Sequence, residues 1–284
     1  MPAVKLLSTD FDGTLIDSSH NDLVSSFPPK ERCDYLLAVE LQEAVQQGSL
    51  WVINTGRPLH LLLLGLEHFD PPVKPHYLIT SERHIYHYRE NGDVEALGDW
   101  NRRCDEEHDV FFKTSGVFFE RVRQLIAEYG DKAIFLENAS GVLDELLVRD
   151  EALLDELSIR ILELPGRPEE FCFQRSHIHL HFCHGSYNKG SSLSELSRLL
   201  SINPEHILAI GDYHNDITML TGEAAAMVAC PSNAHDSVKQ TVKKAGGHIS
   251  LHPSSRGTAE AIGLYRNGKK QNLPQRISNC SVDW

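Results

Sequence analysis

Short apolar runs alternate with stretches of helical periodicity over residues 1–82 of the chain. The runs around Leu6, at Leu50–Asn54 and at Tyr77–Ser81 are rich in strand-forming residues and lead into polar residues. Between them, Tyr35–Gln47 and Leu59–His68 carry apolar residues close to the spacing of one helical face. Strands that alternate with helices in this way are typical of a parallel sheet.

The pattern changes between residues 83 and 185, where most of the structure is expected to be short strands. These strands, some of them paired as hairpins, are Ile85–Tyr88, Val94–Leu97, Ala133–Glu137, Val142–Val148, Phe171–Gln174 and His177–Phe182. The fourth of these runs also fits a helix. Helices are expected at Phe118–Tyr129 and Glu151–Leu157. Hairpins mixed with helices are typical of an α+β domain, which here interrupts the first pattern.

Strand and helix alternate again after residue 185, with helices expected at Lys189–Leu200, Ala234–Lys244 and Thr258–Tyr265 and a strand at Ile207–Ile210. We therefore predict an α/β fold, in which a Rossmann-like, doubly wound parallel-sheet core carries an inserted α+β domain. The expected parts are the core at 1–82 and 186–265, the insertion at 83–185, a loop at 17–31 and a polar tail at 266–284.

The composition narrows the possible partners. The chain has 284 residues, enough for about two domains, and a formal net charge of −13 with histidine neutral. This charge argues against nucleic acid or an anionic membrane as the main partner, since both reward clustered Lys and Arg. We expect no signal peptide, and the apolar run Leu59–Leu66 is too short to span a bilayer. The scattered cysteines favour reduced thiols in a cytoplasmic protein.

Two aspartates follow the first apolar run, one residue apart. Asp10 and Asp12 precede a Gly-Thr turn and stand at the expected carboxyl end of a buried strand, where open α/β sheets bind ligands. Two carboxylates this close repel each other unless a positive charge lies between them. Mg²⁺ suits that position because it binds through one or two carboxylates together with substrate phosphate. The same residues also suit an ordinary polar turn after a strand.

Three further polar motifs stand at strand ends or helix starts. Thr55–Arg57 follows a strand and offers a hydroxyl group and backbone amides to phosphate oxygens. Lys189 opens a helix, where its charge and the positive helix end both favour an anion. A second acidic group, Asp212–Asp216, follows the strand Ile207–Ile210. Each motif alone also fits a turn, a cap or a solvated charge. All four together, in this order and at strand ends or helix starts, favour one shared site.

With these motifs the sequence resembles the haloacid dehalogenase superfamily of phosphohydrolases. The matching motifs are Asp10-x-Asp12-Gly13-Thr14, Thr55-Gly56-Arg57, Lys189-Gly190 and Gly211-Asp212-x-x-Asn215-Asp216. The resemblance extends to about Tyr265, and the insertion is similar to the α/β cap of the sucrose-phosphatase-like and Cof-like branches. It implies a phosphomonoesterase whose cap encloses the active site.

The resemblance also implies a role for each motif. Asp10 would attack phosphorus and form an aspartyl-phosphate, and Asp12 would act first as general acid and then as general base. Asn215 would support the loop around Asp212 or the ammonium group of Lys189. The phosphate-binding residues would be Thr55, Gly56, Arg57 and Lys189, and the residues of the Mg²⁺ site would be Asp10, Asp12, Asp212 and Asp216.

Two features near these motifs have no single expected role. Arg57 suits a contact with substrate and equally a structural salt bridge. The segment Glu82-Arg83-His84 stands where the resembled family often has an Asn-Gly-Ala-like turn. This difference is expected to alter the hinge of the cap or the rim of the substrate site.

Three histidines alternate with apolar residues in the insertion. In a strand, the spacing of His177, His179 and His181 places the three imidazoles on one face and the apolar side chains on the other. Such a row fits a solvent-facing sheet surface, a surface that faces the substrate, or a Zn²⁺ site, although no further ligand group stands out. Because the cap sheet of the resembled family overhangs the active site, the three histidines are candidate substrate-binding residues.

We therefore predict a cytoplasmic, Mg²⁺-dependent phosphatase that acts on a small phosphorylated metabolite, with a sugar phosphate as the expected class. A phosphosugar mutase of the phosphomannomutase kind is the nearest alternative, since such enzymes share a similar core and cap. A non-catalytic protein that binds a phosphometabolite is a third possibility, and the presence of Asp10, Asp12, Lys189 and Asp212 argues against it. The sequence does not decide between a monomer and a homodimer.

Overall fold

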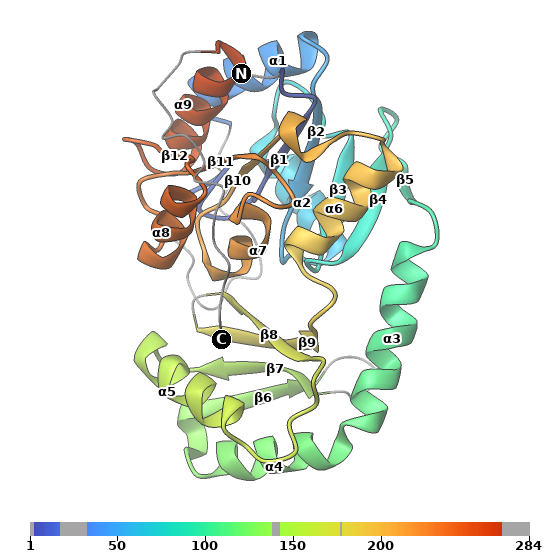
Figure 1. The fold of residues 1–284 in the computed structure, drawn as a ribbon, viewed down its shortest axis with the longest axis vertical. Helices are drawn as coiled ribbons and strands as arrows, with labels where there is room; N and C mark the ends of the chain where they lie inside the picture. Colours follow the sequence, from blue (N-terminus) through green and yellow to red (C-terminus); the bar gives the residue numbers. More distant parts are fainter. Residues whose placement is uncertain (1–2, 18–32, 138–142, 177, 269–284) are drawn as a thin grey trace, which may run out of the picture.

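The computed structural model describes residues 3–17, 33–137, 143–176 and 178–268 of the chain. Within these residues the chain forms one large sheet with helices on both faces and one small sheet below it in the view of Figure 1. Nearly all of the loop expected at 17–31 and most of the tail expected at 266–284 lie outside the described residues.

Among the described residues, the large sheet has eight strands in the order β12-β11-β10-β1-β2-β3-β4-β5. They are β1 (Leu6–Thr9), β2 (Leu50–Asn54), β3 (Tyr77–Thr80), β4 (His84–Tyr88), β5 (Val94–Ala96), β10 (Ile207–Ile210), β11 (Met227–Cys230) and β12 (His248–Ile249). The strands from β12 to β3 run parallel, whereas β4 pairs antiparallel with both of its neighbours, β3 and β5. Since the order steps outward from β1 in both directions, the predicted doubly wound core is confirmed.

Side chains that alternate along the central strands form two apolar cores, one on each face of the large sheet. Leu7 belongs to one core and its neighbour Leu6 to the other, and both side chains are buried. One face is covered by α1 (Tyr35–Gln46), α2 (Leu59–Phe69) and α9 (Ser254–Arg266), and the other by α6 (Lys189–Leu199), α7 (Ile217–Leu220) and α8 (Asp236–Lys244). Burial on both faces explains why these strands read as continuous apolar runs.

In the part of the chain that the structure describes, the small sheet has four antiparallel strands in the order β6-β7-β9-β8. Its strands are β6 (Ala133–Glu137), β7 (Leu143–Val148), β8 (Phe171–Ser176) and β9 (His179–His184), and its helices are α3 (Trp100–Thr114), α4 (Gly116–Ala127) and α5 (Glu151–Leu162). An aromatic core that includes Phe118, Phe171 and Phe182 joins one face of this sheet to the helices. The run Val142–Val148, which also fits a helix in the sequence, contains the strand β7.

Two parts of the fold differ from the sequence-based expectation. The hairpin of β4 and β5 belongs not to the insertion but to the large sheet, because β4 pairs with β3. The helix α3 is not predicted, since only a narrow stripe of it is buried, including Cys104, His108 and Phe111, and charged residues dominate the rest. The insertion with its own sheet therefore begins about at Trp100 rather than at residue 83.

Two chain segments connect the small sheet to the large one, and they lie against each other. The first leads from β5 into α3, and the second leads from β9 into α6. The ring of Trp100 meets the ring of Tyr187 edge to face, with ring centres 5.1 Å apart. Trp100 also donates its indole N–H to the backbone oxygen of Arg83 over 2.7 Å. The contact between Trp100 and Tyr187 therefore ties the two connections together.

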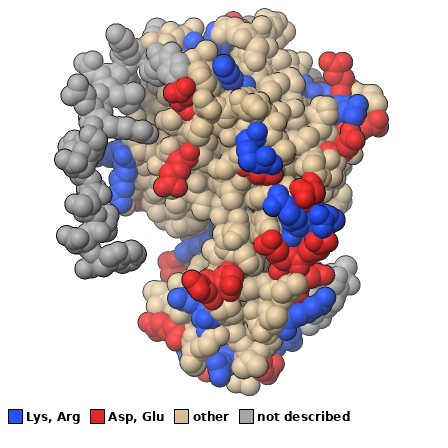
Figure 2. Space-filling view, turned by 45° about the vertical axis from the view of Figure 1, so that its right-hand side comes forward, with Lys and Arg blue, Asp and Glu red and all other residues tan. Residues whose placement is uncertain are grey.

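The surface mixes charges of both signs. Figure 2 shows Lys and Arg side chains interspersed with Asp and Glu over the visible face. Some of them pair within a helix, as Arg102 does with Glu106, and such exposed pairs contribute only about 0.3–0.5 kcal/mol each. The five described cysteines are free thiols. In the described part of the chain, every helix is too short or too polar to cross a bilayer.

Candidate active site

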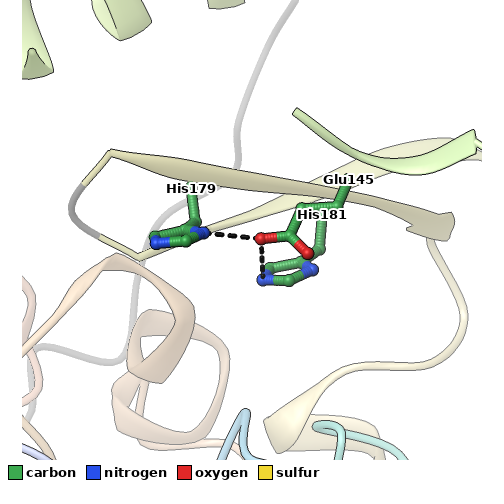
Figure 3. A group of neighbouring side chains, drawn as sticks. All are labelled: Glu145, His179 and His181. Atoms are coloured by element: carbon green, nitrogen blue, oxygen red, sulfur yellow. Dashed lines mark hydrogen bonds and ion pairs between the residues drawn. The ribbon is translucent and has the colours of Figure 1, made fainter. Parts of the chain in front are cut away.

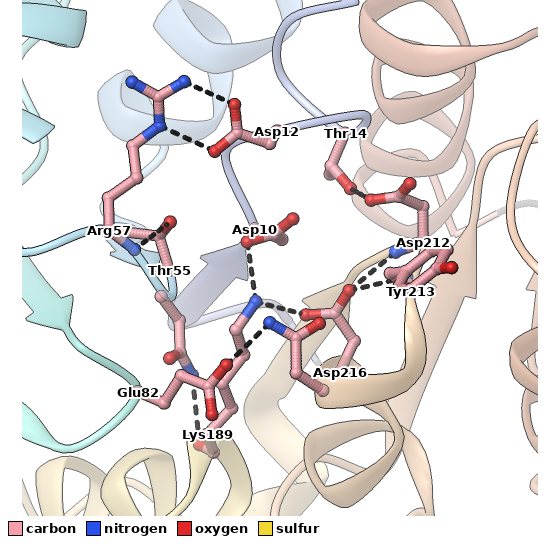
Figure 4. A network of polar contacts seen from close by, with 12 residues as sticks. Asp10, Asp12, Thr14, Thr55, Arg57, Glu82, Lys189, Asp212, Tyr213 and Asp216 are labelled. Atoms are coloured by element: carbon pink, nitrogen blue, oxygen red, sulfur yellow. Dashed lines mark hydrogen bonds and ion pairs between the residues drawn. The ribbon is translucent and has the colours of Figure 1, made fainter. Parts of the chain in front are cut away.

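The polar motifs that follow β1, β2 and β10 meet at one edge of the large sheet. β1 lies between β2 and β10 and pairs in parallel with both, so the residues after these strands are neighbours. Asp10 follows β1, Thr55 follows β2 and Asp212 follows β10 by one further residue, while Lys189 reaches the same point from the start of α6 (Figure 4). The structure thus brings the four predicted motifs together.

The ammonium group of Lys189 bridges two buried carboxylates. Its Nζ atom lies 2.7 Å from Asp10 Oδ1 and 2.6 Å from Asp216 Oδ1, and its side chain is 0% exposed. Asn188 fixes the start of α6, because its side chain accepts hydrogen bonds from two backbone N–H groups of the first turn. Burial alone would lower the pKa of Lys189, but the charges of Asp10 and Asp216 outweigh burial and raise it.

The carboxylates of this cluster carry more negative charge than one ammonium group balances. Burial and the charge of Asp216 raise the pKa of Asp10 well above its usual range, although Lys189 acts in the opposite direction. Burial and Asp216 likewise raise the pKa of Asp212 to about 7. Oxygen atoms of Asp10, Asp212 and Asp216 lie within 4.8 Å of one another. The residues therefore fit a hard divalent cation such as Mg²⁺, which would offset this excess of negative charge.

The side chain of Asp212 is positioned by the loop that follows β1. Thr14 Oγ1 donates a hydrogen bond to Asp212 Oδ1 over 2.8 Å, and Asn233 Nδ2 donates to the backbone oxygen of Gly13 over 2.9 Å. Gly13 has a φ of +72°, and a Cβ atom added there would lie 2.3 Å from Asp212 Oδ2. Only glycine allows both this backbone conformation and this close approach.

Asp12 is held by Arg57 and not by the carboxylate cluster. Arg57 donates from Nε to Asp12 Oδ2 over 2.7 Å and from Nη2 to Oδ1 over 2.5 Å, which is a bidentate pair. The guanidinium group also lies over the ring of Phe11, 5.1 Å from its centre. The salt bridge, one of the two expected roles of Arg57, is therefore present in this structure.

The turn after β2 connects the site to α6 and to β3. Thr55 Oγ1 accepts a hydrogen bond from the backbone N–H of Arg57 over 3.1 Å, and Asn54 Nδ2 donates to the backbone oxygen of Lys189 over 3.0 Å. A Cβ atom added to Gly56 would lie 3.3 Å from Glu82 Oε1, so this turn packs closely against the segment after β3. These contacts hold the predicted phosphate-binding residues in one place.

Glu82 is a buried member of the site that is not among the predicted residues. Its φ is +62°, and its backbone N–H donates to the oxygen of Thr55 over 3.0 Å. Its Oε1 atom accepts a hydrogen bond from Asn215 Nδ2 over 2.8 Å. Burial raises the pKa of Glu82, although the charge of Lys189 and the hydrogen bond from Asn215 act to lower it. The one signal in the sequence is that Glu82 departs from the family-like turn.

His179 and His181 lie on β9 of the small sheet and share one carboxylate oxygen. His179 Nδ1 lies 2.5 Å from Glu145 Oε1, and His181 Nε2 lies 3.8 Å from the same atom. Figure 3 shows these side chains on the sheet face that is turned toward the large-sheet part of the molecule. His177 lies outside the described residues. The two described histidines thus share a face as predicted, together with Glu145, which is not among the predicted residues.

A family model for haloacid dehalogenase-like hydrolases matches residues 73–262, which is more than half of the chain. The chain belongs to that family. The match includes Lys189, Asp212 and Asp216, whereas Asp10 and Thr55 precede its first residue. The hydrolase family that the motifs predict is therefore confirmed, and the geometry adds the N-terminal motifs to the same site.

The matches to relatives and solved structures extend over nearly the whole length of this hydrolase. It is 23% identical over 282 residues to a protein of Streptococcus pyogenes that is provisionally named a phosphatase, with 92% of this chain and 97% of that protein covered. It is 26% identical over 260 residues to a phosphoglycolate phosphatase of Methanospirillum hungatei, with 90% and 94% covered. The sucrose-phosphatase of Synechocystis, solved with sucrose and phosphate, has the same fold, with a TM-score of 0.64, 18% identity and 93% and 98% of the two chains covered.

Proposed function

We propose that this hydrolase is a Mg²⁺-dependent phosphomonoesterase that acts on a small phosphorylated metabolite through an aspartyl-phosphate on Asp10. The observation that carries the proposal is the buried cluster in which Lys189 bridges Asp10 and Asp216 beside Asp212. It combines a nucleophile, a fixed positive charge and carboxylates suited to a divalent cation. The relatives named as phosphatases support the same chemistry. We also propose a cytoplasmic location, which suits the free thiols.

Asp10 is the proposed nucleophile. Its Oδ1 atom accepts a hydrogen bond from Lys189, which leaves the other oxygen to attack phosphorus. The attack forms a bond from Asp10 to phosphorus, and the bond from phosphorus to the leaving oxygen breaks with its electron pair on that oxygen. Water then attacks the same phosphorus, releases inorganic phosphate and restores the carboxylate of Asp10.

Asp12 is the proposed acid and base for these two steps. It would donate a proton to the leaving oxygen and then take a proton from the attacking water. In this structure Arg57 binds both carboxylate oxygens of Asp12. A phosphate ester brings its own negative charge and competes for the guanidinium group. We therefore propose that substrate binding loosens the pair of Asp12 and Arg57 and frees Asp12 for proton transfer.

The turn after β2 and the start of α6 are proposed to bind the phosphoryl group. Thr55, the backbone amide of Gly56 and the ammonium group of Lys189 would face its oxygens, over which charge spreads in the transition state. Arg57 would join them once it releases Asp12. Thr55 and Lys189 are held before substrate arrives and need no rearrangement when the charge develops, whereas Arg57 must first leave Asp12.

Asp10, the backbone carbonyl of Asp12 and the carboxylate of Asp212 are the proposed Mg²⁺ ligands. When bound, Mg²⁺ would supply positive charge next to the phosphoryl oxygens. Asp216 is proposed to order this group, because both of its oxygens are already engaged. Its Oδ2 accepts from the backbone N–H groups of Asp212 and Tyr213, over 2.8 and 2.9 Å, while its Oδ1 accepts from Lys189.

We propose a sugar phosphate as the substrate class and residues 100–184 as the cap. The face of the small sheet that carries His179 and His181 is turned toward the large-sheet part of the molecule, and imidazoles hydrogen-bond to hydroxyl groups. Glu145 places a carboxylate beside His181, at 3.8 Å. The sucrose-phosphatase of the same fold, which was solved with sucrose and phosphate, supports this class.

Turnover of a panel of phosphate esters tests the proposal. Sugar phosphates, polyol phosphates and phosphoglycolate should be incubated with the purified protein in Mg²⁺ and, separately, in EDTA. We expect free phosphate from at least one sugar phosphate, loss of turnover in EDTA and its return with added Mg²⁺. An isomeric phosphate as the product would identify a mutase instead. No turnover of any ester in Mg²⁺ would contradict the proposal and favour a binding protein.

Gly13→Ala is expected to impair turnover and stability together. The added methyl group would overlap Asp212 Oδ2, so the carboxylate or the loop must move on the scale of about 1 Å, a misplacement that costs about 10²-fold in rate. Overpacking at a left-handed φ is expected to lower the free energy of unfolding by about 1–3 kcal/mol. Phosphate release and urea unfolding measure the two effects.

Gly48→Ala is the matched control for this variant. Gly48 also has a left-handed φ, +91°, but a Cβ atom added there would meet nothing within 4 Å. It should therefore show only the backbone cost, about 1 kcal/mol, and keep the rate of the unaltered protein. If Gly13→Ala kept the same rate as Gly48→Ala, the close approach of Gly13 to Asp212 would not matter for the reaction.

A further inference from the structure

We propose that Glu145, His179 and His181 form a Zn²⁺ site on the small sheet, separate from the carboxylate cluster around Asp10. The site goes beyond the proposed phosphatase activity and does not depend on it. It would use Nδ1 of His179 and Nε2 of His181 and leave the other ring nitrogens to hydrogen-bond substrate hydroxyl groups. Two imidazole nitrogens and one carboxylate oxygen, the ligand types of many zinc sites, lie within 4.8 Å of one another. Figure 3 shows the three side chains converging from neighbouring strands.

The pairing of β7 with β9 brings the three side chains together. Glu145 lies directly opposite His181 in the antiparallel register, and His179 is two residues away from His181 on the same strand. Because side chains alternate along a strand, both histidines project from one face, and Glu145 projects beside them. The three ligands therefore stand on hydrogen-bonded strands, which hold their spacing better than a loop would.

The distances between the ligand atoms bracket those of a zinc site. Bond lengths of about 2.0–2.2 Å in tetrahedral geometry place two ligand atoms about 3.4 Å apart. Glu145 Oε1 lies 2.5 Å from His179 Nδ1 and 3.8 Å from His181 Nε2. One distance must therefore lengthen and the other shorten, each by less than about 1 Å. The rings of His179 and His181, whose centres lie 6.2 Å apart and whose planes are nearly parallel, must also turn toward the common ion.

The three proposed ligand side chains are partly open to solvent. The side chains of Glu145, His179 and His181 are 22%, 39% and 48% exposed. A metal ion can therefore reach the three ligand atoms from solvent.

The ligand types favour zinc over magnesium. Imidazole nitrogen suits Zn²⁺ and similar transition metals, whereas Mg²⁺ prefers oxygen ligands such as those of the Asp10 cluster. Three protein ligands leave the fourth tetrahedral position of Zn²⁺ to water or to another oxygen donor. In Figure 3 the three side chains extend from the small sheet toward the large-sheet part of the molecule, so this position would face the same way.

Zinc binding by the intact chain tests the site. With Mg²⁺ in excess to saturate the carboxylate cluster, competition against a chromophoric zinc chelator should show one tightly bound Zn²⁺ per chain. His179→Gln and His181→Gln should each weaken this binding by at least about 10²-fold, because losing a direct ligand costs more than losing an outer partner. Since both side chains are partly exposed, the melting temperatures of the zinc-free variants should match that of the unaltered protein.

Glu260→Gln is the matched control for this site. Glu260 also contacts two histidines, but His248 and His252 approach different carboxylate oxygens, at 2.9 and 3.1 Å. The affinity for Zn²⁺ should therefore be unchanged in Glu260→Gln. If this variant lost zinc binding while His179→Gln and His181→Gln kept it, the proposal would be overturned.

Co²⁺ in place of Zn²⁺ separates this site from two nearby thiols. Cys172 and Cys183 lie opposite each other on β8 and β9. Cys183 is two residues away from His181 on β9 and therefore projects from the same face. The proposed site should give the visible bands of tetrahedral Co²⁺ without thiolate-to-cobalt charge transfer in the near ultraviolet. Charge-transfer bands that vanish in Cys172→Ser would overturn the proposal. No substrate is needed, so failure of this test and failure of the proposed phosphatase activity are distinguishable.

Discussion

Asp10→Asn is expected to abolish phosphate release without loss of the fold. The amide cannot attack phosphorus, and loss of the nucleophile from a group of cooperating residues costs on the order of 10³-fold or more in kcat. Because burial and Asp216 already raise the pKa of Asp10, a neutral side chain of the same shape is not expected to lower the free energy of unfolding. Phosphate release at saturating Mg²⁺ and urea unfolding measure the two quantities.

Asp236→Asn is a suitable control, since Asp236 opens α8 on the surface with its side chain 89% exposed. This variant should keep the rate of the unaltered protein. Acid quenching during turnover should also leave phosphate covalently attached to the unaltered chain and not to Asp10→Asn. Phosphate release by Asp10→Asn at more than about a tenth of the original rate would contradict the assignment of the nucleophile.

Lys189→Met is expected to lower the free energy of unfolding of the metal-free protein by about 3–5 kcal/mol. Methionine is an apolar side chain of similar length, but it removes the fully buried ammonium group that bridges Asp10 and Asp216. The carboxylates would then be buried without a compensating charge. Turnover should fall as well, because the same charge is proposed to bind the phosphoryl group. Urea unfolding in EDTA measures the loss of stability.

Added Mg²⁺ should restore part of the stability that Lys189→Met loses, because the ion supplies positive charge to the same carboxylates. Lys113→Met is the control. Lys113 Nζ lies 3.9 Å from Asp109 on the helix surface, with both side chains more than 70% exposed, at 78% and 72%. This variant should change the free energy of unfolding by less than about 0.5 kcal/mol. Similar losses of unfolding free energy in the two variants would show that the buried bridge contributes no more to stability than the exposed ion pair.

The residues that follow the central strands were predictable because each strand is a short buried run that ends in a polar group. Asp10, Thr55 and Asp212 follow β1, β2 and β10, and the rule that carboxyl ends of parallel strands share one edge brings them together. Lys189 was predictable for a different reason, as a charged residue that opens a helix. Local pattern and one rule of topology were sufficient for this part of the site.

The partners of these residues were not predictable, since they depend on register and on unusual backbone conformations. Glu82 enters the site through a left-handed φ of +62° directly after β3, which no apolar pattern specifies. Glu145 meets His181 only because β7 pairs with β9 in one register. A shift of one residue would turn Glu145 to the opposite face of the small sheet. The histidine pattern thus suggests a surface, whereas the structure supplies its carboxylate.

The contact between Trp100 and Tyr187 holds together the two chain connections between the small and the large sheet. The centres of the two rings are 5.1 Å apart, and the rings would separate if one connection moved without the other. The contact, worth about 0.5–1.5 kcal/mol, therefore opposes a movement of the small sheet that displaces one connection alone. Tyr187 is followed by Asn188, which caps α6, and then by Lys189. The contact therefore connects the start of α3, through three consecutive residues, to the helix turn that carries the buried ammonium group.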